Sequence, residues 1–145
     1  MSRLTIQLPE HIPFSTEIPV RVDDVNYGGH LGNDALVSLL HDARIRYLGA
    51  HGLSEGDCGG AGMVVTELAV TYLAEAFHGD NLRISLAVGD VGRTRVHFYY
   101  RVERTRDNVE IARAQTGMAF FDFTSRRPRR TPEAFRAALG TDEAA

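Results

Sequence analysis

A stretch of eleven residues, DDVNYGGHLGN, gathers the side chains of this chain that are best suited to chemistry. Asp24 supplies a carboxylate and His30 an imidazole, which are the groups that proteins use most often to move protons. Asn26 adds an amide between them that can position a water molecule or the carboxylate. Together these three side chains indicate a reaction in which an activated water, or the carboxylate itself, attacks a polarised carbonyl.

The same stretch ends where a long helix is expected to begin. Asn33 or Asp34 is a plausible N-cap, and apolar residues then recur at helical spacing to about Ala50. A helix start presents unpaired N–H groups and a positive dipole end, and Gly28 and Gly29 allow close backbone approach. We therefore expect an oxyanion site near Leu31.

Alternating apolar and polar residues predict strands before and after this helix. We expect one strand before the helix and four after it, then a short helix at the end of the chain. A single apolar face on each strand favours antiparallel pairing, with the long helix covering that face. The fold class is α+β, one domain over 1–145, with a central helix wrapped by a curved antiparallel sheet of about five strands. The expected strands are 17–23, 62–74, 80–91, 93–104 and 110–123, and the short helix is 132–139.

The composition excludes several classes of function. The formal net charge of -3 gives no general attraction to nucleic acid, and no apolar run is long enough to cross a membrane. Cys58 is the only cysteine and no signal peptide is apparent, which suits a cytoplasmic protein. The chain contains no lysine, and its histidines lack the spacing of metal ligands.

The motifs in their order resemble the hotdog-fold acyl-CoA thioesterases, the 4-hydroxybenzoyl-CoA thioesterase-like family. Asp24 matches the family aspartate, although two residues appear inserted between it and His30. The segment HLGN matches the family's His-Val-Asn-Asn, HDAR resembles its Glu-Ala-Arg on the central helix, and HGD resembles its Tyr-Gly-Asp before the third strand. The resemblance runs from about Thr16 to Phe135.

This resemblance implies a thioester hydrolase that cleaves an acyl-CoA, or an acyl-ACP, to a free acid and a thiol. Asp24 would drive the attack with His30 and Asn26 assisting, and CoA would be part of the substrate, with no other cofactor. A homodimer or a dimer of dimers is implied as well. Residues expected to bind the substrate are Gly28, Gly29, Leu31, Asn33 and Glu67.

Structural alternatives stand beside each assignment. Asp24 can serve as a helix or turn carboxylate, Asn26 as a turn former, Asn33 as a cap and Glu67 as a solvated side chain. The Arg126–Arg130 cluster is either a solvated tail or a site for CoA phosphates. Two other functions remain open: a hotdog hydratase or dehydratase, and a non-catalytic acyl-CoA binding module.

Overall fold

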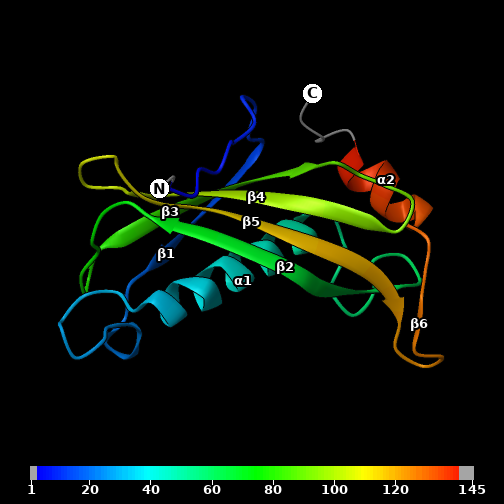
Figure 1. Cartoon of the computed structure of the whole chain (residues 1–145), viewed down its shortest axis with the longest axis horizontal. Coiled ribbons are helices and arrows are strands. Elements are labelled where there is room, and N and C mark those ends of the chain that lie inside the picture. The colour runs from blue at the N-terminus through cyan, green and yellow to red at the C-terminus, as the bar shows by residue number, and fades with distance from the viewer. Residues whose placement is uncertain (1–2, 141–145) are drawn as a thin grey trace.

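The computed structural model describes residues 3–140, which form one curved antiparallel sheet with a long helix lying along one of its faces (Figure 1). That helix, α1, spans Asn33–Ala50, and the short helix α2 spans Glu133–Leu139. The predicted α+β arrangement is confirmed. The strands are β1 Phe14–Pro19, β2 Gly62–Tyr72, β3 Asn81–Gly89, β4 Arg95–Arg104, β5 Val109–Asp122 and β6 Arg127–Pro128.

The strands are arranged in the order β1-β3-β4-β5-β2, with the two-residue β6 paired to the end of β5. Every pair is antiparallel. The main core forms where the apolar stripe of α1 meets the buried face of the central strands, as alternation along those strands requires. Its largest fully buried side chains include Leu36, Leu40, Tyr47, Phe98, Tyr100 and Phe120.

The first strand ends earlier than the sequence suggests. A strand as far as Asp23 was predicted, but β1 stops at Pro19 and Val22–Asp24 forms a single 3-10 turn. The prediction was wrong there because the carboxylate of Asp24 accepts the backbone N–H of Arg21 at 2.8 Å, which turns the chain back on itself. This turn delivers the following loop to the start of α1.

Strand β2 forms an edge of the sheet, and large apolar side chains of this strand and of Leu73, the residue after it, are uncovered. Val65, Leu68, Tyr72 and Leu73 are each between 46% and 48% exposed. Tyr72 faces α1, since its hydroxyl donates to the carbonyl of Asn33 at 2.9 Å, and Leu68 lies on the same face by strand alternation. Among residues 3–140, no helix is long and apolar enough to cross a membrane.

Candidate active site

The loop between the 3-10 turn and α1 is a tight hairpin closed by backbone hydrogen bonds. The N–H of Asn26 donates to the carbonyl of His30, and the N–H of Gly29 donates back to the carbonyl of Asn26, both at 2.9 Å. Gly29 has a φ of 85°, a conformation that favours glycine. The hairpin therefore fixes His30 one turn before the helix.

A cavity of about 650 Å³ opens beside this hairpin, at the start of α1. Its walls come from the hairpin, from the first turn of α1, and from the end of β2 with the connection that follows. It holds four of the eight predicted site residues: Asn26, His30, Leu31 and Asn33. Its other lining residues are Tyr27, Gly32, Leu36, Tyr72, Leu73, Ala74, Glu75, Ala76 and Ile111.

Asp24 does not line this cavity. It is 6% exposed, and its carboxylate is occupied by the backbone N–H and the guanidinium of Arg21. Burial alone would raise the pKa of Asp24, but the N–H and guanidinium of Arg21 outweigh burial and hold it below the ordinary value. The backbone carbonyl of Asp24 accepts the N–H of Gly32 at 2.9 Å. The side chain of Asp24 therefore stabilises the 3-10 turn, and its backbone carbonyl stabilises the hairpin that follows.

His30 has a ring without a hydrogen-bonding partner among the described residues. The ring is partly buried and meets the Phe77 ring edge-on, with centroids 6.4 Å apart. Backbone contacts keep it there, because His30 pairs with Phe77 across an isolated bridge and Leu31 donates to the carbonyl of Ala76 at 2.8 Å. Its ring nitrogens remain available to a substrate or a water molecule.

The backbone N–H groups that the sequence suggests as oxyanion donors are engaged within the fold. The N–H groups of Gly28, Gly29 and Leu31 are already used inside the hairpin and by Ala76. In the first turn of α1, side chains or carbonyls accept the N–H groups of the next three residues, Asp34 to Leu36. Within residues 3–140, no acceptor occupies the N–H of Asn33, which lines the cavity. Asn33 is thus the helix-start donor that is free for a carbonyl oxygen.

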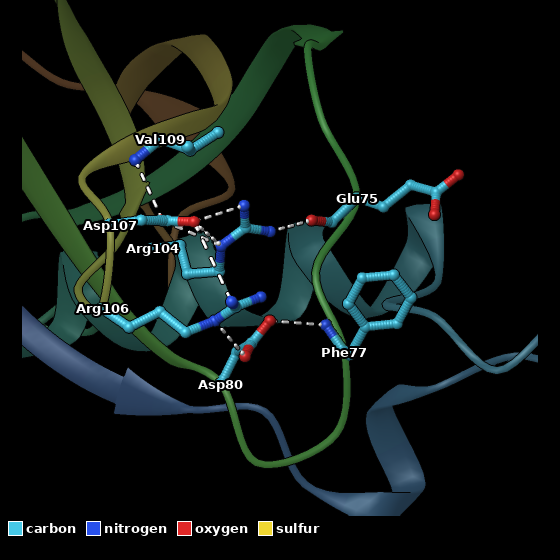
Figure 2. A network of polar contacts seen from close by, with 7 residues as sticks. All are labelled: Glu75, Phe77, Asp80, Arg104, Arg106, Asp107 and Val109. Carbon is cyan, nitrogen blue, oxygen red and sulfur yellow. Dashed lines mark hydrogen bonds and ion pairs between the residues drawn. The ribbon is translucent and has the colours of Figure 1, made fainter.

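Glu75 is an acidic residue of the cavity wall that the sequence did not reveal. It lies in the connection after β2, and its backbone carbonyl accepts the Arg104 guanidinium at 2.6 Å. Arg104 is held in turn by Asp107, and the same connection is fixed where the N–H of Phe77 donates to Asp80. Figure 2 shows the Glu75 carboxylate pointing away from the Arg104–Asp107 pair. Its side chain is therefore free while its backbone is anchored.

Glu67 lies elsewhere. It points to the opposite face of the sheet from Leu68, where its carboxylate is 3.7 Å from the ring of His97. The structure does not bring it to the cavity at the helix start. Across residues 3–140, no group of three or more His, Cys, Asp or Glu side chains could hold a metal ion.

Comparison with known proteins identifies the family. The sequence model of the Thioesterase-like superfamily matches residues 20–139, so this chain belongs to that superfamily. A search of the curated proteins finds no match. With this match and the curved sheet around α1, the predicted hotdog thioesterase family and fold are confirmed.

Solved structures share the fold at low identity. Slr0204, a 1,4-dihydroxy-2-naphthoyl-CoA thioesterase from Synechocystis, is 21% identical with a TM-score of 0.81, over 88% of this chain and 95% of that one. The hypothetical protein TT1821 from Thermus thermophilus is 25% identical with a TM-score of 0.80, over 91% and 98%. SAV2348 from Staphylococcus aureus, solved in complex with CoA, is 18% identical with a TM-score of 0.81, over 97% and 91%.

Proposed function

We propose that this thioesterase-superfamily protein hydrolyses an acyl-CoA to a free acid and CoA, at the cavity beside the start of α1. One observation carries the proposal: the same cavity is lined by a residue with a free helix-start N–H and by two residues whose side chains can accept and pass on a proton. The donor is that of Asn33, and the acceptors are His30 and Glu75. Two structural neighbours support CoA as the thiol, since one is a CoA thioesterase and another was solved with CoA.

The carbonyl oxygen of the thioester would lie against the Asn33 N–H, where the helix dipole favours negative charge. Glu75 would take a proton from a water molecule whose oxygen bonds to the carbonyl carbon. The carbon–sulfur bond then breaks and its electron pair leaves with sulfur. His30 would pass the proton held by Glu75 to that sulfur, so that both side chains return to their starting state, and Asn26 would orient the water.

Asp24 takes a positioning role in this mechanism. Its carboxylate would have to leave Arg21 and its buried position to reach a substrate, which would also release the turn before the hairpin. Direct attack by Asp24, which the sequence suggests, is therefore less favoured by the geometry than catalysis by groups on the cavity wall. Gly28 and Gly29 likewise serve to shape the hairpin.

A homodimer completes this proposal. The exposed apolar side chains of β2 and its unpaired backbone edge are the kind of surface that proteins cover. Two copies joined at antiparallel β2 strands would continue the sheet across a two-fold axis, and two such dimers could associate further. Tyr72 and Leu73 line the cavity and belong to this edge, so the partner would close its open side. A cytoplasmic location is proposed with it.

Release of thiol from a panel of acyl-CoAs tests the function. Purified protein is mixed with short, medium, long and aromatic acyl-CoAs and with an enoyl-CoA. Free thiol is trapped with a chromogenic disulfide, and the absorbance of the enoyl group is followed in parallel. We expect turnover of at least one class. Tight acyl-CoA binding without thiol release would replace the proposal with a binding module, and loss of enoyl absorbance without thiol release would replace it with a hydratase.

A further inference from the structure

A second cavity of about 490 Å³ follows the first along the seam between α1 and β2. Leu36 lines the first cavity and Leu40, one helical turn later, lines the second. On the strand, Tyr72 lines the first and Leu68 the second. Most of the second cavity's wall is apolar, formed by Val37, Leu40, Met63, Val64, Val65, Leu68 and Met118.

A polar cluster around the buried Arg44 interrupts this apolar wall. The guanidinium of Arg44 donates from Nε to Glu55 at 2.5 Å and from Nη1 to the hydroxyl of Tyr100 at 2.9 Å. Tyr100 shares a hydrogen bond of 2.8 Å with the hydroxyl of Thr116. The other oxygen of Glu55 lies 2.6 Å from His41. All but Tyr100 line the cavity.

Arg44 retains an unused donor in this cluster. Its side chain is only 6% exposed, yet Arg44 lines the cavity. Its Nη2 makes no hydrogen bond with any residue that the structure describes, while Nε and Nη1 are both engaged. No fully buried side-chain nitrogen or oxygen in the described chain lacks a partner, so Nη2 keeps some accessible surface in a residue that lines the cavity.

The cluster is hard to explain by stability alone. Burying the Arg44 guanidinium removes a charge from water, and apolar side chains of similar size often stabilise a fold as well or better. Glu55 already neutralises Arg44, so the free N–H offers a hydrogen bond without a net positive charge. Such a donor suits a neutral oxygen, because a second carboxylate would be repelled by Glu55.

We propose, on the basis of the thioesterase function above, that this second cavity receives the far end of the acyl group and recognises a neutral oxygen there. Arg44 Nη2 donates to that oxygen, and the Thr116 hydroxyl lies on the same wall. Preferred substrates carry a distal hydroxyl rather than a plain hydrocarbon end. Asn33 and Arg44 are eleven residues apart on α1, about 16 Å along its axis, which suits a medium-length acyl chain.

Matched substrates test this inference. The kcat/KM of ω-hydroxydecanoyl-CoA is compared with that of decanoyl-CoA, for the wild type and for Arg44→Lys and Thr116→Val. We expect the wild type to prefer the hydroxylated substrate by about tenfold, the effect of one hydrogen bond to a charged donor. The ratio should fall towards one in both variants. Arg46→Lys, an exposed position on the same helix, is the matched control and should keep the wild-type ratio.

Several outcomes would overturn the inference. Equal kcat/KM for the two substrates in the wild type would do so, and so would a preference that both variants retain. A stronger preference for the ω-carboxylated decanoyl-CoA would reject a neutral oxygen. Thermal denaturation checks that each variant folds. If Arg44→Lys does not fold, Thr116→Val is the variant that tests the inference.

A binding measurement separates this inference from the proposed function. Calorimetry compares ω-hydroxydecanoic acid with decanoic acid, without any turnover. If no thioester is cleaved but the hydroxy acid binds more tightly and the variants lose that difference, the distal site stands and the hydrolase proposal fails. If thioesters are cleaved but the two acids bind equally, the distal site fails and the hydrolase proposal stands.

Discussion

The carboxylate of Asp24 accepts the backbone N–H of Arg21, three residues before it, at 2.8 Å. Its carbonyl accepts the N–H of Gly32 on the far side of the hairpin. Asp24 thus joins the end of the first strand to the start of α1. The residue that the sequence marks as a catalytic carboxylate is one on which the shape of the site depends.

Replacing Asp24 with Asn tests this structural role. We expect the free energy of unfolding to fall by about 1–2 kcal/mol, as for other losses of a buried charged acceptor. The pKa of Asp24 is lowered in the folded protein, so its contribution is present above the unfolded pKa of about 4 and is lost as the pH falls through the folded value. Urea unfolding between neutral and acidic pH should therefore show the wild type and variant converging in acid.

The activity of the same variant separates the two roles of Asp24. A positioning role predicts a partial loss of kcat that accompanies the loss of stability. Abolished hydrolysis with unchanged stability would instead make Asp24 the attacking group or base, as the sequence suggests.

Glu75 offers the matching test on the cavity wall. Replacing it with Gln removes the proton acceptor while keeping the size of the side chain and leaving the Arg104 contact to its backbone intact. We expect kcat to fall by a factor of about 10² to 10⁴, the range for loss of a general base. Glu67→Gln is the control, since that carboxylate lies on the other face of the sheet. Equal activity of both variants would remove Glu75 from the mechanism.

The sequence predicted much of the fold from periodicity alone. The helix at Asn33–Ala50 was confirmed, and the four later strands were confirmed within a few residues. The apolar residues of the helix recur at helical spacing and those of the strands alternate, so in each segment only one type of secondary structure places them on a single face. Proline has no backbone N–H to donate within a sheet, and Pro19 ends the edge strand β1.

The site was harder to predict because it depends on which polar groups are already engaged. Asp24, Gly29 and Leu31 have the residue types and spacing of a catalytic site. In the folded chain, however, their polar groups make hydrogen bonds to other residues of the protein. Glu75 belongs to no motif, and Arg44 lies in a motif that does not show what the side chain contacts; only the folded chain brings the two residues to cavity walls. The sequence shows how polar groups are spaced along the chain. Which of them already make hydrogen bonds depends on contacts that form only in the folded structure.

Cys58 provides a test of burial in the loop before β2. Its side chain is fully buried, and burial, with Glu55 and Asp57 nearby, raises the pKa of the thiol to about 12. At pH 8 only about one thiol in 10⁴ would be ionised, and the thiolate is the reactive form. We expect almost no labelling by iodoacetamide in the native protein and rapid labelling in denaturant. Fast labelling without denaturant would show that this loop opens.

The unpaired edge of β2 leads to a prediction about assembly. We expect light scattering during size exclusion to give the mass of a dimer or a tetramer for the wild type. Leu68→Arg places a charge in the middle of the exposed apolar row, so it should shift the protein towards the monomer. Val109→Arg is the control, because Val109 is exposed at the start of β5, a strand paired on both sides.

Activity should follow assembly if the partner closes the cavity. Tyr72 and Leu73 belong both to the edge and to the cavity wall, so monomeric Leu68→Arg would leave the substrate open to water on that side. We expect its KM for acyl-CoA to rise together with the monomer fraction and to fall as protein concentration restores the dimer. A monomeric wild type with full activity would contradict both the β2 interface and the closure of the cavity by a partner.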